Sequence, residues 1–261
     1  MTAKGSDKRT PVTSLPVLTF HSIEDTPSVI SFAPRVFLRG LTKLHEHGYQ
    51  ALALAEAAAR MGRGDAVPER SVVLTFDDGY KSVYDEAFPI LKRYGMSATI
   101  FLTVGTDRAQ KSSRRLPTLC GRPMLSWGEI REMARCGMSF GAHTLTHPDL
   151  TKLSPDRISM EILESKSIIE DALGLPVACF AYPFGRSNRQ SREIVKSHFA
   201  CAVSDMLGLL SAESDPHAID RIDAYYLRTD RLFHLLLTDI FPWYVLGRRA
   251  LRRARRAVAW R

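Results

Sequence analysis

The chain has 261 residues, of which 45% are hydrophobic and 25% charged, so it is long enough to bury a full core and favours one α/β domain. Its net charge of +8 is concentrated in the last fourteen residues, RRALRRARRAVAWR, which hold seven arginines and leave 29 basic against 28 acidic residues elsewhere. This nearly neutral body argues against a basic groove for nucleic acid. The four cysteines lack CxxC spacing, which argues against a disulfide scaffold and predicts reduced, mostly buried thiols.

Short runs of β-branched and aromatic residues alternate with longer helical patterns along the chain. Strands are expected at 17–22, 72–76, 98–104, 138–142, 177–182 and 200–203. Helices are expected at 35–47 and from Pro155, after an N-cap at Ser154, to a stop at Gly174. This alternation predicts a parallel sheet with crossover helices, preceded by a flexible segment at 1–15. The main domain is expected at 16–230, followed by an apolar-aromatic and then arginine-rich segment at 231–261.

Polar residues of chemically useful types follow the predicted strands. Ligands of parallel β/α folds bind at the carboxyl ends of strands, so these residues are expected to converge. They are His21, Asp77, Asp78, His143, His147 and the run Tyr182-Pro183-Phe184-Gly185.

The stretch VVLTFDDGY ends a run of strand formers with two adjacent carboxylates, Asp77 and Asp78. Such a pair is expensive to desolvate unless water, a cation or a proton relieves it. Asp-Asp-Gly is also ordinary turn chemistry, so a plain turn is the alternative interpretation.

Two histidines in GAHTLTHPDL, His143 and His147, are four residues apart, which is a spacing that metal sites use. Pro148 restricts the residue before it, so we expect His147 to end a turn and not to lie within a helix. Two imidazoles and one carboxylate make a three-ligand set that leaves a position open for water, as catalytic metal sites require. Surface or capping histidines are the alternative.

Together, TFDDG and HTLTH resemble the first and second motifs of the polysaccharide deacetylases of the NodB-homology type, carbohydrate esterase family 4. The resemblance covers about residues 16–228. It implies a distorted (β/α) barrel of about seven parallel strands with outer helices. It also implies a divalent metal, usually zinc, and hydrolysis of N-acetyl groups on amino sugars of a glycan.

Carried over residue by residue, the resemblance implies that Asp77 is the catalytic base. It also implies that Asp78, His143 and His147 are the metal ligands. The family's third motif, Arg-x-Pro-Tyr, is here Ala181-Tyr182-Pro183-Phe184, so the arginine that orients the base is missing from its expected place. Arg186 and Arg221 remain open as replacements.

The rest of the third motif is retained. The backbone amide of Phe184 resembles the donor that stabilises the tetrahedral oxyanion, and a backbone donor tolerates a change of side chain. Tyr182 and Pro183 are expected to bind substrate.

The late histidine motif of the family has no match near the C-terminus, but His21 in VLTFHSIED follows the first strand. In this respect the chain resembles the permuted branch that contains biofilm poly-N-acetylglucosamine deacetylases, which implies that His21 is the catalytic acid. Two other functions remain open. One is a catalytically silent glycan-binding module, and the other is a metal amidohydrolase of a small non-sugar amide.

The segment LFHLLLTDIFPWYVLG precedes the arginine-rich end, and its aromatic residues are of the types favoured at a membrane surface. Charges and prolines occupy the N-terminus where a signal peptide needs an apolar stretch. We therefore expect a cytoplasmic protein in peripheral contact with anionic membrane, whose truncation after Arg231 would spare activity on soluble oligomers. The alternative is a solvated basic helix.

Overall fold

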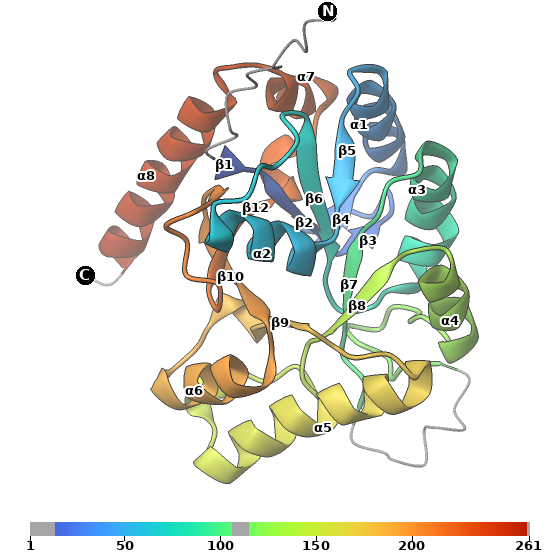
Figure 1. Ribbon diagram of the computed structural model, residues 1–261, viewed down its shortest axis with the longest axis vertical. Coiled ribbons are helices and arrows are strands. Elements are labelled where there is room, and N and C mark those ends of the chain that lie inside the picture. Colours follow the sequence, from blue (N-terminus) through green and yellow to red (C-terminus); the bar gives the residue numbers. More distant parts are fainter. Residues whose placement is uncertain (1–13, 106–114, 260–261) are drawn as a thin grey trace, which may run out of the picture.

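A closed parallel barrel forms the centre of the molecule (Figure 1), and the structure, a computed structural model, describes residues 14–105 and 115–259. Seven strands follow one another around it in the order β2, β12, β10, β9, β8, β7 and β6, and β6 returns to pair with β2. An eighth parallel strand, β5, pairs with β6. The bounds of these strands are β2 Val17–Phe20, β5 Gln50–Leu52, β6 Ser71–Phe76, β7 Thr99–Leu102, β8 Ser139–Ala142, β9 Cys179–Ala181, β10 Cys201–Leu207 and β12 Ile219–Asp223. The predicted distorted (β/α) barrel is confirmed.

Helices surround the barrel in the sequence order expected of crossover connections. They are α1 Pro34–Glu46, α2 Leu54–Arg63, α3 Phe88–Tyr94, α4 Trp127–Arg135, α5 Pro155–Leu173, α6 Arg189–His198, α7 Asp230–His234 and α8 Phe241–Ala259. Short helical turns are η1 Val83–Ala87, η3 Leu150–Lys152, η4 Pro183–Gly185, η5 Ala224–Leu227 and η6 Leu235–Leu237. Two small strand pairs join β1 Ser14–Leu15 to β11 Leu210–Ser211, and β3 Ser22–Ile23 to β4 Ser31–Phe32.

The six strands expected from the sequence are all present, with ends that differ by a few residues. The first ends at Phe20 and not at Ser22, so His21 lies just beyond the strand. The helices predicted at 35–47 and from Pro155 to Gly174 are α1 and α5. Strands β5 and β12 were not predicted, because β5 is only three residues long and β12 reads IDRID, which lacks the apolar run of a strand buried on both faces.

The barrel interior is filled by its own apolar cluster. The first residues of β2, β9, β10 and β12 belong to this cluster together with the buried side of α2. Helix α2 therefore closes the amino-terminal end of the barrel, and Figure 1 shows it crossing in front of the strands. The opposite, carboxyl-terminal end stays available for polar groups.

Strand register brings the predicted site residues together. Phe20 pairs with Phe76, so the residues that follow them, His21 and Asp77, leave neighbouring strands side by side. The amide of Asp77 donates to the carbonyl of Phe20 at 2.9 Å, which continues the ladder past the strand end. The segment 115–126 is tied to the same place because the amide of Leu125 donates to the carbonyl of Gly79 at 2.9 Å.

The C-terminal segment packs on the barrel and shares its main hydrophobic core. Phe233, Leu236, Phe241 and Val245 are buried in that core, and the ring of Phe233 occupies the space that a side chain at Gly40 would fill. Among the described residues no helix has the length and low polarity needed to cross a membrane. Because removal after Arg231 would uncover this core, we do not retain the expectation that truncation spares activity.

The prediction of reduced cysteines agrees with the structure, but the prediction that they are mostly buried is wrong. All four are free thiols, and Cys179 and Cys201 are buried on neighbouring strands with their sulfurs 3.5 Å apart. Cys120 and Cys136 are exposed, because one lies in the irregular segment 115–126 and the other caps the end of α4.

Two residues of α8 with opposite burial test whether this helix belongs to the folded unit. Phe241 is 4% exposed and Trp243 is 74% exposed. We expect Phe241→Ala to lower the free energy of unfolding by about 3–5 kcal/mol, since it leaves a cavity in the core. Trp243→Ala should change it by less than about 0.5 kcal/mol. Urea denaturation measures both, and equally small changes would contradict the packing of α8 on the barrel.

Candidate active site

One cavity of about 600 Å³ collects most of the residues predicted from the sequence. Its lining includes His21, Asp77, Asp78, His143, His147, Tyr182, Phe184 and Arg221. They come from the ends of β2, β6, β8 and β9 and from within β12. The convergence expected at the carboxyl ends of parallel strands is therefore observed.

Asp78, His143 and His147 form a compact set of three ligands. The Nε2 atoms of both histidines lie 3.5 Å from Asp78 Oδ1, and the three donor atoms all lie within 4.8 Å of one another. Asp78 Oδ1 is buried and accepts no hydrogen bond. A buried carboxylate oxygen without a donor is costly, so this geometry fits a bound divalent cation.

His143 is oriented by the backbone of β9. Its Nδ1 lies 2.7 Å from the carbonyl oxygen of Ala181, which can only accept, so Nδ1 carries the hydrogen and Nε2 faces Asp78. Burial lowers the pKa of His143, but the close Asp78 carboxylate and the charge of Asp77 raise it by more. The same two carboxylates attract a cation, which would replace that proton.

His147 is the more neutral member of the pair. Burial and the neighbouring charge of His143 lower the pKa of His147 to about 4, which favours the uncharged imidazole that a metal requires. Its ring lies 4.7 Å from those of His143 and Phe184. As predicted, His147 is not in a helix. Its φ of +57° is in the left-handed region, where a non-glycine residue is strained.

The DDG sequence is both a turn and a ligand-bearing segment. The amide of Gly79 donates to the carbonyl of Asp77 at 3.0 Å across Asp78, whose φ is +74°. Gly79 has φ +89°, and a Cβ there would lie 2.9 Å from Leu116. The turn therefore requires glycine at this position and points Asp78 toward the histidines.

Asp77 is held by Arg221, which settles the choice left open between Arg186 and Arg221. Two parallel hydrogen bonds of 2.8 and 2.7 Å join Nη1 and Nη2 of Arg221 to the two oxygens of Asp77. Burial raises the pKa of Asp77, but the charge and hydrogen bonds of Arg221 lower it by more, so the carboxylate stays ionised. Arg186 instead pairs with Asp149 at 2.7 Å.

His21 lies beside Asp77 in the cavity wall. Its Nε2 lies 3.9 Å from Asp77 Oδ2, and its side chain is partly open to solvent. Phe184, at φ +57° in the turn η4, lines the cavity on another side. Tyr182 is also in the wall, but its ring packs on Phe180 in the outer core, and Pro183 is buried at the start of η4. A direct substrate contact of the Tyr182 and Pro183 side chains stays a prediction.

Sequence reasoning missed one residue that builds the site. Glu161 of α5 is fully buried, and its carboxylate accepts from the amides of Leu145 and Thr146 at 2.9 Å each and from the hydroxyl of Thr146 at 2.7 Å. These residues lie between the two histidines, so Glu161 fixes the ligand loop. A glutamate on the apolar stripe of a helix is the signal that would have found it.

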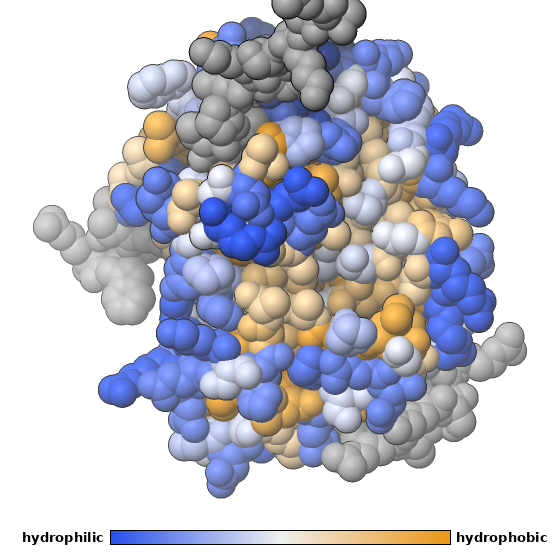
Figure 2. All heavy atoms as spheres, viewed as in Figure 1, coloured by the Kyte–Doolittle hydropathy of each residue, from blue (hydrophilic) through white to orange (hydrophobic). Residues whose placement is uncertain are grey.

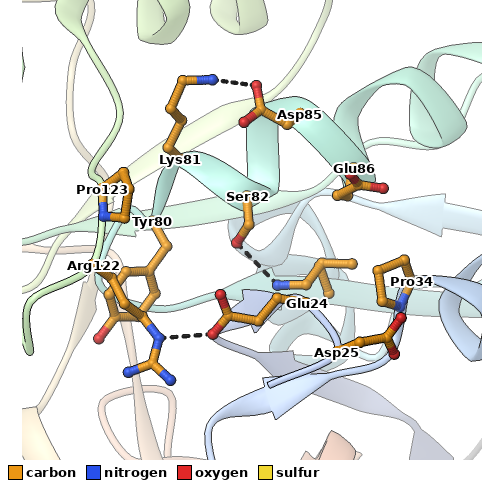
Figure 3. A pocket seen from close by; sticks show the side chains of 11 residues that line it. Glu24, Asp25, Pro34, Tyr80, Lys81, Ser82, Asp85, Glu86, Arg122 and Pro123 are labelled. Atoms are coloured by element: carbon orange, nitrogen blue, oxygen red, sulfur yellow. Dashed lines mark hydrogen bonds and ion pairs between the residues drawn. The ribbon is translucent and has the colours of Figure 1, made fainter.

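A smaller cavity of about 330 Å³ adjoins the site, and Tyr80 lines both (Figure 3). Its walls are polar but internally paired. Lys81 bonds Asp85, and Arg122 donates to Glu24 at 2.7 Å. The smaller cavity extends the polar surface beside the ligand set.

Three comparisons place this arrangement among known proteins. The family model described as "Polysaccharide deacetylase" matches residues 64–200. A Bacillus subtilis (strain 168) protein assigned to the polysaccharide deacetylases, YxkH, is 31% identical over 209 residues, which are 80% of this chain and 70% of that protein. The chain belongs to the polysaccharide deacetylase family.

One solved structure and one further relative are also similar to this chain. The structure of the Streptococcus pyogenes deacetylase PplD in complex with acetate superimposes with a TM-score of 0.72 at 29% identity, covering 82% of this chain and 93% of that one. The Escherichia coli (strain K12) poly-beta-1,6-N-acetyl-D-glucosamine N-deacetylase is 31% identical over 135 residues. That match covers 49% of this chain but only 20% of the longer protein.

A glutamine at position 161 tests the support of the ligand loop. Glu161→Gln removes the charge and one acceptor from the bonds to 145–146, so we expect the affinity for zinc to fall about 10–100-fold, as when other supports of ligands are lost. Titration of zinc into metal-free protein measures it. Asp156→Asn makes the same change of charge at an exposed position of α5 and should have no effect. Unchanged affinity in Glu161→Gln would refute the role of Glu161.

Proposed function

We propose that this polysaccharide deacetylase removes N-acetyl groups from the amino sugars of a polysaccharide or oligosaccharide, releases acetate, and uses zinc held by Asp78, His143 and His147. The observation that carries the proposal is the pair of adjacent carboxylates in two different states. Asp78 presents a buried oxygen without a hydrogen-bond donor to two imidazole nitrogens, whereas Asp77 is kept ionised by Arg221. Metal-assisted hydrolysis of an amide uses both a cation site and an ionised carboxylate that can accept a proton.

When bound, a divalent ion at these ligands polarises the acetamide carbonyl and acidifies a water molecule. Asp77 accepts the proton of the attacking water as a carbon–oxygen bond forms. The Phe184 amide donates to the oxyanion of the tetrahedral species. His21 then gives a proton to the amine as the carbon–nitrogen bond breaks, which leaves acetate and a free amino sugar.

The substrate class follows from the size and polarity of the site. The main cavity of about 600 Å³ and the smaller cavity of about 330 Å³ share the lining residue Tyr80, and together they give room for more than one sugar unit. This supports a glycan over a small non-sugar amide. The alternative of a catalytically silent glycan-binding module was based on the absence of the third-motif arginine that orients the base. Arg221, which binds Asp77, argues against it.

Acetate release from N-acetylglucosamine oligomers tests the proposal. The zinc-loaded protein should release acetate and lose that activity with chelator. Asp77→Asn should lower kcat by about 10²–10⁴-fold with zinc retained, since a base acts on a proton and not on the metal. His143→Ala should lose both zinc and activity. His198→Ala, an exposed histidine outside the cavity, is the matched control and should keep both.

Three outcomes would contradict the proposed function. Tight binding of the oligomers with no acetate at any zinc loading would identify a binding module. Turnover of small non-sugar amides in preference to every N-acetylated glycan would identify another amidohydrolase. Zinc retained by His143→Ala would move the metal site elsewhere.

We also propose peripheral contact of α8 with anionic membrane, and the cytoplasmic location stays a prediction. Trp243, Leu246 and Leu251 are exposed on this helix, and Arg253 is exposed beside them. Apolar and hydrophilic residues mix at the left of Figure 2, where α8 runs. An apolar stripe next to arginine suits an interfacial helix, in which each arginine contributes about 1 kcal/mol near anionic lipid.

Co-sedimentation with phosphatidylserine-containing vesicles at low salt tests this contact. The double variant Trp243→Ser with Leu246→Ser keeps the charge but removes apolar area, so we expect binding to fall about tenfold or more. Activity on soluble oligomers should not change. Wild-type protein that ignores such vesicles, or a double variant that binds them equally well, would contradict the contact.

A further inference from the structure

Strand β10 carries a bulge next to the active site. Its residue Val203 pairs with Ile219 of β12, but Leu207 pairs with Arg221, so four steps on β10 match two on β12. Extra residues in one strand leave carbonyl groups without ladder partners, and such bulges are frequent beside active sites. The bulge includes Ser204 and Asp205.

Two arginines bind the successive carbonyls of this bulge. Nε of Arg221 donates to the carbonyl of Ser204 at 3.1 Å, and Nη1 of Arg252 donates to the carbonyl of Asp205 at 2.5 Å. Nη2 of Arg252 also donates to the Asp205 carboxylate at 2.5 Å. Arg252 thus binds both the backbone and the side chain of Asp205, whereas Arg221 connects the bulge to Asp77.

Arg252 belongs to α8 and reaches the catalytic cavity, of which both it and Asp205 are lining residues. Their side chains are 27% and 29% exposed, so water screens this pair only in part. The previous turn of α8 is also fixed to the barrel, because Arg249 pairs with Asp220 at 3.4 Å. The arginine-rich segment is therefore anchored where it meets the site.

Asp205 in turn supports the turn η4. A Cβ on Gly185 would lie 2.2 Å from Asp205 Cβ and 2.3 Å from its backbone nitrogen, so the two backbones touch with no room for a side chain between them. Gly185 has φ +63° and follows Phe184 at φ +57°. Two successive left-handed residues need support from their surroundings, and Asp205 supplies it.

We propose that Arg252 is a positioning residue of the active site, which fixes Asp205 in the β10 bulge and thereby fixes the turn that presents the Phe184 amide to the oxyanion. This rests on the proposed function of that amide. Because a misplaced donor weakens binding of the transition state more than binding of the substrate, loss of Arg252 should lower kcat and leave KM nearly unchanged. We expect a fall of about 10–10²-fold.

The test compares Arg252→Ala with Arg253→Ala, the neighbouring exposed arginine that does not line the cavity. Both variants lose one positive charge from the same helix. Steady-state acetate release from N-acetylglucosamine oligomers gives kcat and KM, and zinc content and thermal unfolding are measured alongside. Hydrogen–deuterium exchange of the peptide 182–186 reports on the turn without reference to activity.

The expected result is a lower kcat and faster exchange at 182–186 in Arg252→Ala, with zinc content and KM unchanged, and wild-type values in Arg253→Ala. Asp205→Ala should reproduce the Arg252→Ala effect, and the double variant should be no worse than the more affected single variant. A raised KM with unchanged kcat would show a substrate contact and overturn the proposal. Wild-type kcat and exchange in Arg252→Ala would also overturn it.

Failure of the proposed function is distinguishable from failure of this inference. If the wild-type protein releases no acetate, the proposed function fails, whereas exchange at 182–186 still tests whether Arg252 holds the turn. If the wild-type protein turns over and both Arg252→Ala readouts are unchanged, only the role of Arg252 is lost.

Discussion

The ion pair between Asp77 and Arg221 is the interaction on which the rest of the site depends. Adjacent buried carboxylates repel each other, and each is costly to desolvate. Arg221 relieves Asp77 with two charge-assisted hydrogen bonds from inside the barrel. This leaves Asp78 as the carboxylate for a cation, since two imidazole nitrogens lie 3.5 Å from Asp78 Oδ1. In the proposed function, one sequence pair is thereby divided into a proton acceptor and a metal ligand.

The β10 bulge connects this ion pair to the other working parts of the site. Arg221 binds Asp77 and the Ser204 carbonyl, while Arg252 binds the next residue, against which the Phe184 turn rests. The proposed base, the proposed oxyanion donor and the C-terminal helix therefore share one short piece of strand. The left-handed backbone of the Phe184 turn is stabilised by these contacts.

Local patterns in the sequence predicted much of this site, and long-range contacts account for what they missed. TFDDG and HTLTH keep their chemistry within a few residues, so the resemblance of these motifs to the family's was enough to predict that Asp78 and the two histidines lie together. Arg221 lies 144 residues from Asp77. The sequence of its strand, IDRID, resembles a charged loop, because the arginine that points into the barrel interrupts the apolar run expected of a buried strand. Glu161 and Arg252 likewise act across the fold. Glu161 is marked only by its place on the apolar stripe of α5, and no short pattern marks Arg252. The C-terminal segment was expected to be dispensable for activity, because sequence cannot show that Phe241 and Val245 enter the core.

Anomalous diffraction at the zinc absorption edge, from crystals of the zinc-loaded protein, tests the central claim most directly. The account predicts one strong peak at about 2.0–2.2 Å from Asp78, His143 and His147. Both oxygens of Asp77 should remain on Arg221 and off the metal. A peak that Asp77 coordinates, or no peak among these three residues, would contradict the division of the two carboxylates.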